Sequence, residues 1–552
     1  MKNIFFIIID ALRFDSLNDN VSKKIAPNLK KLCDEGILQK VTTNGQTTKF
    51  ALPSIFTQTF PLDYGGYNYG IKNKPRSFVE LISKKNFFCR MFEGHDVDGP
   101  FGCMERGFNY NGCYYDKRIL LEGFIKKKLL YDVKKWQLGE ISKTEILKTI
   151  QKEILEILNF MKKQERVKHS FFEDKIGPYS EREKKLLDKE IALLTDFPEL
   201  ILEKITKINP YFYYDYIGKK PSNLTFLKFK IKNKLFSYKK KLQTTFNRIF
   251  STEIHFVPSR PKVSLSCKKM FLDALKNYER HNLKIFTYIH FMDLHDHHVF
   301  YQFFEDFFSK VRLIPRVFIA RSKNKTNNPR KFTYDLALCN IDYQFSIFLK
   351  KLEKMKKMKD SIFFITGDHG EGWDKMRLKE LKKDFGFRTY SELLTVPFVI
   401  SPFKSKQLKN SNLFDSMSIS ATILDILDIK QHSSFKGKSI FSKGNKIIIT
   451  ESCGRGNADI EKKDIFFTLT ASKYKLFCKI EGKVMLLKRL YSLESDAREL
   501  KNIINSAPSK VLNDFLSYLY SKRKEILTIR GFRKIPRLDH SNVKVKADHL
   551  VN

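Results

Sequence analysis

Short apolar runs that stop at polar residues alternate with helix-like stretches over most of the chain. The first run, residues 4–9, contains only isoleucine and phenylalanine and ends at Asp10. Similar runs occupy residues 285–290, 361–366 and 396–400. Short runs rich in β-branched and aromatic residues are typical of strands that are buried on both faces of a parallel sheet. The pattern therefore predicts an α/β fold with a mostly parallel central sheet flanked by helices.

Helix signals lie between these runs. Pro27 suits the first turn of a helix, and Gly36 suits its C-terminal end. A second helix is expected to begin near Pro53, at the end of a polar loop. Two more helices are expected over residues 334–354 and 508–526. These helices would cover the faces of the predicted sheet.

The stretch from Asp116 to Pro261 interrupts the alternation of strands and helices. It is rich in lysine, and its apolar residues between 146 and 161 recur mostly at spacings of three and four. That spacing predicts a helix with one apolar face. The most basic part, residues 219–241, interleaves lysine with phenylalanine and leucine. We expect a helical insertion that acts as a lid or a docking surface, and the alternative is a peripheral helical hairpin with no part in the chemistry.

Three further apolar runs predict a smaller sheet towards the C-terminus, at residues 446–450, 466–470 and 474–479. The residues after the last helix are polar and are expected to form a loose tail. The predicted organisation is a first part of the α/β domain (1–115), a basic helical insertion (116–261), a second part of the α/β domain (262–405), a C-terminal subdomain (406–527) and a polar tail (528–552).

The net charge of +41 over 552 residues indicates an anionic partner. A field of that sign attracts nucleic acid, anionic lipid head groups and phosphorylated or sulfated glycans. The abundance of Lys, Ile, Phe and Asn together also fits coding bias towards A/T-rich codons. No recognised nucleic-acid-binding motif is present, so nucleic acid is disfavoured as the main partner. The sequence leaves the number of subunits open.

The N-terminal apolar run is too short for a signal peptide, because it meets Asp10 and then Arg13. No run reaches the roughly 18–20 apolar residues of a membrane span. We expect a cytoplasmic protein whose charge allows peripheral contact with a membrane. The eight cysteines form no CxxC pair and are expected to be free thiols, although Cys103 and Cys113 could pair in an oxidising compartment.

Polar residues that suit metal binding follow three of the predicted strands. Asp10 follows the first strand, His290 and His295 lie at the end of the second, and Asp368 and His369 follow the third. Parallel strands bring their carboxyl ends to one edge of a sheet, where ligands bind. Carboxylates and imidazoles are ligands for divalent cations. Taken alone, an aspartate after a strand can equally be a helix cap or a turn residue, so that alternative stays open for Asp10.

These segments together resemble the alkaline phosphatase superfamily, in particular its sulfatase branch and the phosphoethanolamine transferases. The family motif Gly-Asp-His-Gly-Glu is present unaltered, so the resemblance implies that Asp368 and His369 bind a metal ion. Asp10 corresponds to the acidic metal ligand after the first strand. His290 and His295 match the spacing of a histidine pair that lies near the phosphoryl and leaving groups in the transferases.

The nucleophile position departs from the sulfatases. Their motif begins with Cys or Ser, which becomes formylglycine, and alignment on Pro53 places Ala51 there. Alanine cannot be converted to formylglycine, and it has no atom that could attack the ester. The transferases place a threonine five residues before their proline, and here that residue is Thr48. A bound divalent cation can stabilise a threonine alkoxide. Thr47 is adjacent and remains an alternative.

The resemblance implies one divalent ion (Zn, Mn, Mg or Ca) held by Asp10, Thr48, Asp368 and His369. Thr48 would attack phosphorus or sulfur, and His295 or His290 would stabilise the transferred group or protonate the leaving oxygen. The family's usual basic residue after the metal motif is replaced by Phe385, so Lys49 or Arg388 is expected to contact the anion instead.

The predicted function is that of a metal-dependent hydrolase or transferase of phosphate or sulfate esters. Ala51 favours phosphate, and the anionic substrate could be carried on a glycan or a lipid. One alternative is a sulfuric ester hydrolase. A second is a non-catalytic relative whose basic insertion binds an anionic glycan, a lipid surface or nucleic acid.

Overall fold

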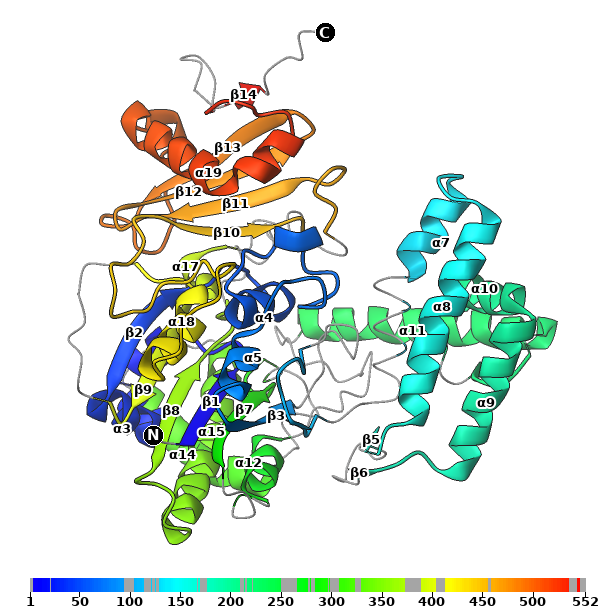
Figure 1. Cartoon of the computed structure of the whole chain (residues 1–552), viewed down its shortest axis with the longest axis horizontal. Coiled ribbons are helices and arrows are strands. Elements are labelled where there is room, and N and C mark those ends of the chain that lie inside the picture. The colour runs from blue at the N-terminus through cyan, green and yellow to red at the C-terminus, as the bar shows by residue number, and fades with distance from the viewer. Residues whose placement is uncertain are drawn as a thin grey trace.

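The computed structural model is shown in Figure 1. It describes residues 3–19, 21–93, 104–113, 121, 125, 129–165, 167–168, 176–208, 213, 216–220, 222–249, 266–276, 278, 283–295, 297, 307–322, 329–372, 389–403, 413–454, 458–535 and 544–546. The side chains of residues 168, 176, 225, 236, 239–249, 307, 322, 329 and 544–546 lie outside this description.

A seven-stranded sheet forms the centre of the protein. Neighbouring strands are parallel except β9, which runs opposite to both of its neighbours. The predicted α/β fold with a mostly parallel sheet is confirmed. The strand order is β2 (Ile37–Thr42), β9 (Thr395–Ser401), β8 (Ser361–Thr366), β1 (Asn3–Ile9), β7 (Lys284–Phe291), β3 (Phe87–Glu93) and β4 (Tyr110–Asn111).

Strand β1 lies between β8 and β7 and is buried on both faces. Ile4, Phe6 and Ile8 belong to one hydrophobic cluster, whereas the alternate residues of the strand belong to another. Successive side chains of a strand point to opposite faces, so each cluster lies on one side of the sheet. Burying such a side chain contributes roughly 1.5–3 kcal/mol. The continuous apolar run of β1 therefore reflects its central place.

Helices cover both faces of the sheet (Figure 1). On the face of Phe5, Ile7 and Ile9, the cluster includes apolar residues of α3 (Pro27–Glu35), α12 (Cys267–Leu275), α14 (Phe307–Ser322) and α15 (Pro329–Lys354). On the opposite face it includes residues of α4 (Thr48–Thr57), α5 (Phe78–Ser83) and α18 (Met417–Ile426). Among the described residues, three short helices, α1 (Asp15–Asn18), α2 (Ser22–Ile25) and α17 (Ser391–Leu394), and the 3-10 turns Asp63–Gly65 and Ile504–Ser506 also lie outside the insertion and α19.

The sequence predicted the C-terminal end of α3 correctly but not the start of α4. Helix α3 ends at Gly36 as expected, where an added Cβ would lie 2.1 Å from the carbonyl oxygen of Ile400. The expected start near Pro53 is wrong, because α4 begins at Thr48 and contains Pro53 in its interior. Every residue of α4 from Phe50 to Thr57 is buried. A helix buried on all sides has no amphipathic pattern from which its first turn could be identified.

The basic insertion forms a group of helices beside the α/β body (Figure 1). Its only strands in the described residues form a separate two-stranded sheet, β5 (Val167–Lys168) with β6 (Ile176–Gly177). The apolar face predicted between residues 146 and 161 is confirmed, because Ile146, Ile150 and Ile154 are fully buried. The helices are α7 (Leu130–Gln137), α8 (Lys143–Lys162), α9 (Glu181–Asp196), α10 (Pro198–Lys207) and α11 (Asn223–Ile249).

The predicted smaller sheet is confirmed as an antiparallel sheet at the C-terminal end (Figure 1). Helix α19 (Ser509–Ile529) contributes apolar residues to the core of this sheet. The segment expected as a loose tail contributes the last strand, which pairs with residues 484–486. No helix in the described residues is both long and apolar enough to cross a membrane. The strands are β10 (Ile448–Ser452), β11 (Ile465–Thr470), β12 (Tyr474–Glu481), β13 (Val484–Ser492) and β14 (Lys544–Lys546).

Candidate active site

The carboxyl ends of β1, β7, β8 and β3 bring the candidate residues to one edge of the central sheet. In the strand register, Ile8 of β1 lies opposite His290 of β7 and Thr366 of β8. Asp10 follows β1, and Asp368 follows β8. Residues far apart in the sequence therefore meet because the strands are parallel and in register.

Asp10 is the centre of this site and is fully buried. Its Oδ2 atom accepts a hydrogen bond of 3.0 Å from Thr48 Oγ1 and lies 3.6 Å from His290 Nε2. Its Oδ1 atom lies 3.4 Å from His369 Nε2. One carboxylate thus contacts side chains from α4, from β7 and from the loop after β8.

The loop after β8 is held close to β1 by its glycines. An added Cβ at Gly367 would lie 2.6 Å from the carbonyl oxygen of Leu12, and one at Gly370 would lie 2.1 Å from that of Glu392. These close approaches place Asp368 Oδ1 where it accepts a 3.2 Å hydrogen bond from the Ala11 N–H. Only glycine permits such approaches without displacing the backbone.

The histidine of this loop is oriented by its own neighbour. His369 Nδ1 lies 2.7 Å from the carbonyl oxygen of Gly370. A carbonyl only accepts, so Nδ1 carries the proton, and in the neutral ring Nε2 presents a lone pair. Nε2 lies 3.3 Å from Thr48 Oγ1 and 3.6 Å from Asp368 Oδ2. The ring thus presents a ligand atom to the other polar groups.

A glutamate that the sequence did not single out orients His290. Glu93 is the last residue of β3, it lies opposite His290 in the strand register, and its Oε1 atom is 3.0 Å from His290 Nδ1. Both residues are buried. A carboxylate on the far nitrogen fixes the orientation and the tautomer of an imidazole. The only sequence signal was an acidic residue at the end of an apolar run.

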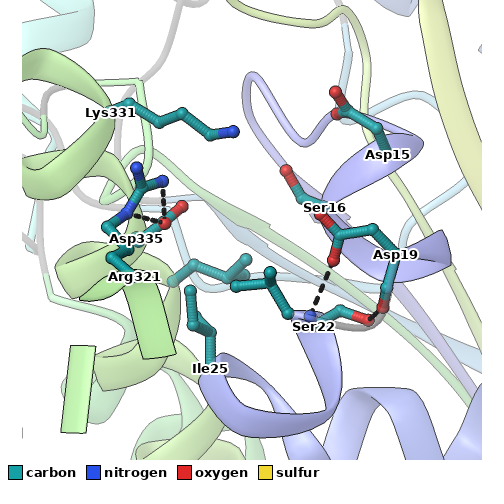
Figure 2. A pocket seen from close by; sticks show the side chains of 10 residues that line it. Asp15, Ser16, Asp19, Ser22, Ile25, Arg321, Lys331 and Asp335 are labelled. Atoms are coloured by element: carbon teal, nitrogen blue, oxygen red, sulfur yellow. Dashed lines mark hydrogen bonds and ion pairs between the residues drawn. The ribbon is translucent and has the colours of Figure 1, made fainter. Parts of the chain in front are cut away.

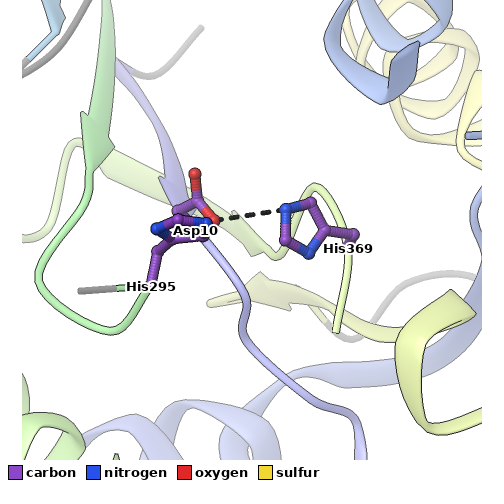
Figure 3. A group of neighbouring side chains, drawn as sticks. All are labelled: Asp10, His295 and His369. Carbon is purple, nitrogen blue, oxygen red and sulfur yellow. Dashed lines mark ion pairs between the residues drawn. The ribbon is translucent and has the colours of Figure 1, made fainter. Parts of the chain in front are cut away.

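The side chains fit a divalent cation. Asp10, His290 and Asp368 have ligand atoms within 4.8 Å of one another, and so do Asp10, His295 and His369. Figure 3 shows Asp10 facing His369, with His295 beside it. Asp10 Oδ1, Asp368 Oδ2 and His290 Nε2 are buried with no hydrogen-bond partner among the described residues. Buried polar atoms are rarely left unsatisfied, and a cation held by Asp10 and Asp368 would satisfy the two carboxylate oxygens.

The charges at the site keep the carboxylate of Asp10 ionised. Burial by itself raises the pKa of Asp10, but the charges of His295 and of the other two histidines outweigh burial and hold the pKa well below its usual range. Burial lowers the pKa of His290, but the nearby carboxylates of Asp10, 3.6 Å away, and Glu93, 3.0 Å away, outweigh burial and raise the pKa to about 10. An ionised, buried carboxylate is a suitable ligand for a hard cation.

The structure distinguishes the two candidate threonines. Thr48 is the first residue of α4, is 7% exposed, and contacts Asp10 and His369 through its hydroxyl. Thr47 precedes the helix in an extended conformation, and its side chain makes no cap hydrogen bond. Ala51 lies one turn further along α4 and is fully buried. The geometry brings Thr48 into the group of possible metal ligands.

Two of the other predicted residues, His295 and Lys49, lie within the described part of the chain. His295 is half-buried, and its ring centroid is 6.0 Å from that of His369. Lys49 follows Thr48 in α4, and its Nζ atom lies 5.7 Å from the ring centroid of Tyr67. Arg388 lies outside the described residues. The anion-contact roles of Lys49 and Arg388 stay predictions.

Arg13 joins the loops that follow β1 and β8 and was not predicted. Its Nη1 atom donates a 2.6 Å hydrogen bond to the carbonyl oxygen of Glu371, and its Nε atom donates one of 2.8 Å to Asp15. The backbone N–H of Arg13 donates to the Tyr334 hydroxyl, which donates to the carbonyl oxygen of Ala11. These bonds hold the loop after β1 against the loop after β8.

A separate pocket lies between α1–α2 and α14–α15. Figure 2 shows its polar wall, where Arg321 pairs with Asp335 and Asp19 accepts a hydrogen bond from the Ser22 N–H. Neither Asp10 nor Thr48 lines this pocket. Its remaining lining residues are Asp15, Ser16, Val21, Ile25, Lys331 and Leu338.

Comparison with known proteins finds similarity over part of the chain. Residues 217–429 match the Sulfatase family model. An arylsulfatase from Clostridium perfringens is 26% identical over 211 residues, which cover 35% of this chain and 40% of that protein. The resemblance to the sulfatase-like branch of the alkaline phosphatase superfamily is confirmed. The match spans less than half the length of the curated sulfatase.

Solved structures share the sulfatase-like fold over nearly the whole chain. A candidate sulfatase from Bacteroides thetaiotaomicron has a TM-score of 0.52 and 12% identity, with 99% of this chain and 95% of that chain covered. A 2-O GAG sulfatase has a TM-score of 0.50 and 13% identity, with the same coverage of both chains. At these identities the similarity establishes the fold alone.

Proposed function

We propose that this chain is a metal-dependent hydrolase or transferase of phosphate or sulfate esters in which Thr48 is the nucleophile. The observation that carries this proposal is the position of Thr48 Oγ1, 3.0 Å from Asp10 Oδ2 and 3.3 Å from His369 Nε2. A threonine hydroxyl is a weak nucleophile unless its surroundings favour the alkoxide. A buried group of carboxylates and imidazoles that fits a cation supplies such surroundings.

Asp10, Asp368, His369 and the Thr48 oxygen would hold the ion. A divalent cation bound there would make the Thr48 hydroxyl easier to ionise and would offset the negative charge of the ester. Asp10 accepts the Thr48 hydrogen bond and so fixes the direction of the hydroxyl. Glu93 and the Gly370 carbonyl orient His290 and His369, so little reorganisation is needed when a substrate binds.

The proposed reaction has two displacements. The Thr48 hydroxyl loses its proton to solvent, and its Oγ1 attacks phosphorus or sulfur. The bond to the ester oxygen breaks, and the leaving oxygen takes a proton from an imidazole, which later recovers one from the attacking water or acceptor hydroxyl. His295 suits this donor role because it is half-buried, whereas His290 is fully buried and bonded to Glu93. Water or an acceptor hydroxyl then displaces Thr48 and regenerates the free side chain.

Phosphate esters are the first candidate substrates. Ala51 occupies the position of the sulfatase nucleophile and has no nucleophilic atom, which argues against formylglycine chemistry. A sulfuric ester hydrolase is the second candidate, supported by the Sulfatase match and by the similarity to an arylsulfatase. In either case the substrate would be an anionic ester, carried on a glycan or a lipid.

Two adjacent variants test the proposal. The full chain is screened against phosphate monoesters, phosphate diesters and sulfate esters with Zn, Mn, Mg or Ca, and Thr48→Ala is compared with Thr47→Ala on every ester that the wild type accepts. We expect Thr48→Ala to lose several orders of magnitude in kcat, on the scale of the ~10⁶-fold loss seen for a serine nucleophile. Thr47→Ala should stay close to wild type. Near-normal turnover by Thr48→Ala would eliminate the proposed nucleophile.

A further inference from the structure

Helix α11 of the basic insertion carries an apolar stripe that faces away from the protein. Consecutive members of the stripe are three, four, four and three residues apart, which places them on one face of a helix. Side chains exposed singly are ordinary, whereas a row of five along one helix forms a contiguous apolar patch. The members are Leu224 (60% exposed), Leu227 (54%), Ile231 (52%), Leu235 (55%) and Tyr238 (56%).

Lysines flank this stripe on both sides. At 100° per residue, Lys228 and Lys232 fall on one side of the stripe, and Lys230 and Lys234 fall on the other. All four side chains are exposed. No acidic residue occurs between residues 216 and 252. The outer face of α11 is therefore an apolar row between two rows of positive charge.

The opposite face of α11 packs against the rest of the insertion. Phe229 is 1% exposed, and its ring centroid lies 4.5 Å from that of Tyr216. Lys207 of α10 lies over the ring of Phe226, with 4.8 Å from its Nζ atom to the ring centroid. These contacts fix the rotation of the helix and turn the stripe outward. Packing within the described residues explains the inner face and leaves the outer face without a structural role.

We propose that the outer face of α11 docks this protein on the surface of an anionic phospholipid bilayer. An amphipathic helix with lysines beside an apolar face lies in the plane of the interface. The five apolar side chains would enter the boundary between head groups and acyl chains, and the lysines would meet the anionic head groups. The proposal concerns binding alone, so it does not depend on the ester chemistry of the active site.

Charge favours a bilayer over two other occupants. A second copy of this helix would bring lysine rows together with no acidic residue between residues 216 and 252 to pair with them. Nucleic acid would satisfy the lysines but leave the apolar row in water, since phosphate contacts come from the charged side chains. An anionic bilayer can bury the apolar row at its interface and pair its head groups with the lysines.

Vesicle co-sedimentation of the full chain tests this proposal. Vesicles of phosphatidylcholine alone are compared with vesicles that also contain phosphatidylglycerol, at low and high salt. One variant removes the apolar row (Leu227→Gln with Ile231→Gln), and a second removes the charge (Lys228, Lys230, Lys232 and Lys234, each to Gln). Matched controls remove equally exposed leucines elsewhere (Leu138→Gln with Leu500→Gln, 64% and 62% exposed) and four exposed lysines elsewhere (Lys430, Lys443, Lys483 and Lys488, each to Gln).

We expect the wild type to bind the anionic vesicles, with weaker binding at high salt. The lysine variant should lose roughly 1,000-fold in partition coefficient, because each of its four lysines near an anionic surface contributes about fivefold to binding. The apolar variant should lose at least about tenfold, and the two controls should stay within about threefold of wild type.

Three results would overturn the proposal. The first is no binding of the wild type to anionic vesicles at low salt. The second is an equal loss in the lysine control, which would make the net charge of the chain responsible. The third is a concentration-dependent dimer, seen by light scattering, that the Leu227→Gln, Ile231→Gln variant abolishes, because the stripe would then be an interface between two copies.

Discussion

Replacing Glu93 tests whether the fold positions His290 for chemistry. Glu93 Oε1 lies 3.0 Å from His290 Nδ1, and His290 is fully buried. Glu93→Ala leaves the buried imidazole N–H without this acceptor, at a cost of about 1–3 kcal/mol. Carboxylates that orient an imidazole at a metal site typically contribute 10–100-fold to activity or metal affinity. We therefore expect Glu93→Ala to lower kcat/KM by roughly 100-fold, or about 2.7 kcal/mol.

The comparison of Glu93→Ala with Glu93→Gln separates orientation from stability. Glutamine keeps an acceptor oxygen at the same position, so Glu93→Gln should recover a large part of the activity. The assay is kcat and KM on an accepted ester, together with bound metal measured by elemental analysis and the midpoint of thermal unfolding. A kcat/KM of Glu93→Ala within twofold of wild type would show that Glu93 does not position His290 for chemistry. Equal kcat/KM losses in both variants would show that the negative charge matters rather than the hydrogen bond.

Three further predictions concern metal content, the insertion and pH. Asp368→Ala should remove most of the bound divalent metal, measured by elemental analysis after dialysis; wild-type protein that purifies without metal would favour a non-catalytic binding role. Glu190→Ala should destabilise the insertion by about 3–5 kcal/mol, because it leaves Lys204 buried without its 2.7 Å partner, yet kcat should stay unchanged. Urea unfolding and turnover measured on the same sample check both parts. Burial raises the pKa of Asp342 to about 6, so the folded state binds its proton more tightly than the unfolded state. Stability from this group should fall as pH rises from about 4 to 6, and Asp342→Asn should remove that dependence in urea titrations; an unchanged profile would contradict it.

The sequence was sufficient to predict that Asp10, Asp368 and His369 lie close together, and their roles stay predictions. Asp10 and Asp368 each follow a short apolar run, and the carboxyl ends of parallel strands meet at one edge. The spacing to Pro53 indicated Thr48 through a resemblance, and the structure places its hydroxyl beside Asp10. Local pattern and topology were enough for Asp10 and Asp368 because each follows a recognisable strand, whereas Thr48 depended on the resemblance.

Other features depend on tertiary structure and could not be read from the local pattern. Glu93 reaches His290 only because β3 pairs with β7 in one particular register. The first turn of α4 was missed because that helix is buried on all sides. The outward rotation of α11 is set by the packing of Phe229, which no periodicity of α11 alone could reveal.

The most direct test of the central claim is mass spectrometry of the Thr48 peptide during turnover. The metal-loaded wild type is mixed with an accepted ester, quenched rapidly in acid, digested and analysed by tandem fragmentation. We expect one added phosphoryl or sulfuryl group on Thr48, absent without substrate and absent in Thr48→Ala. A group found on Thr47 or Ser54, or an unmodified Thr48 peptide throughout turnover, would contradict it.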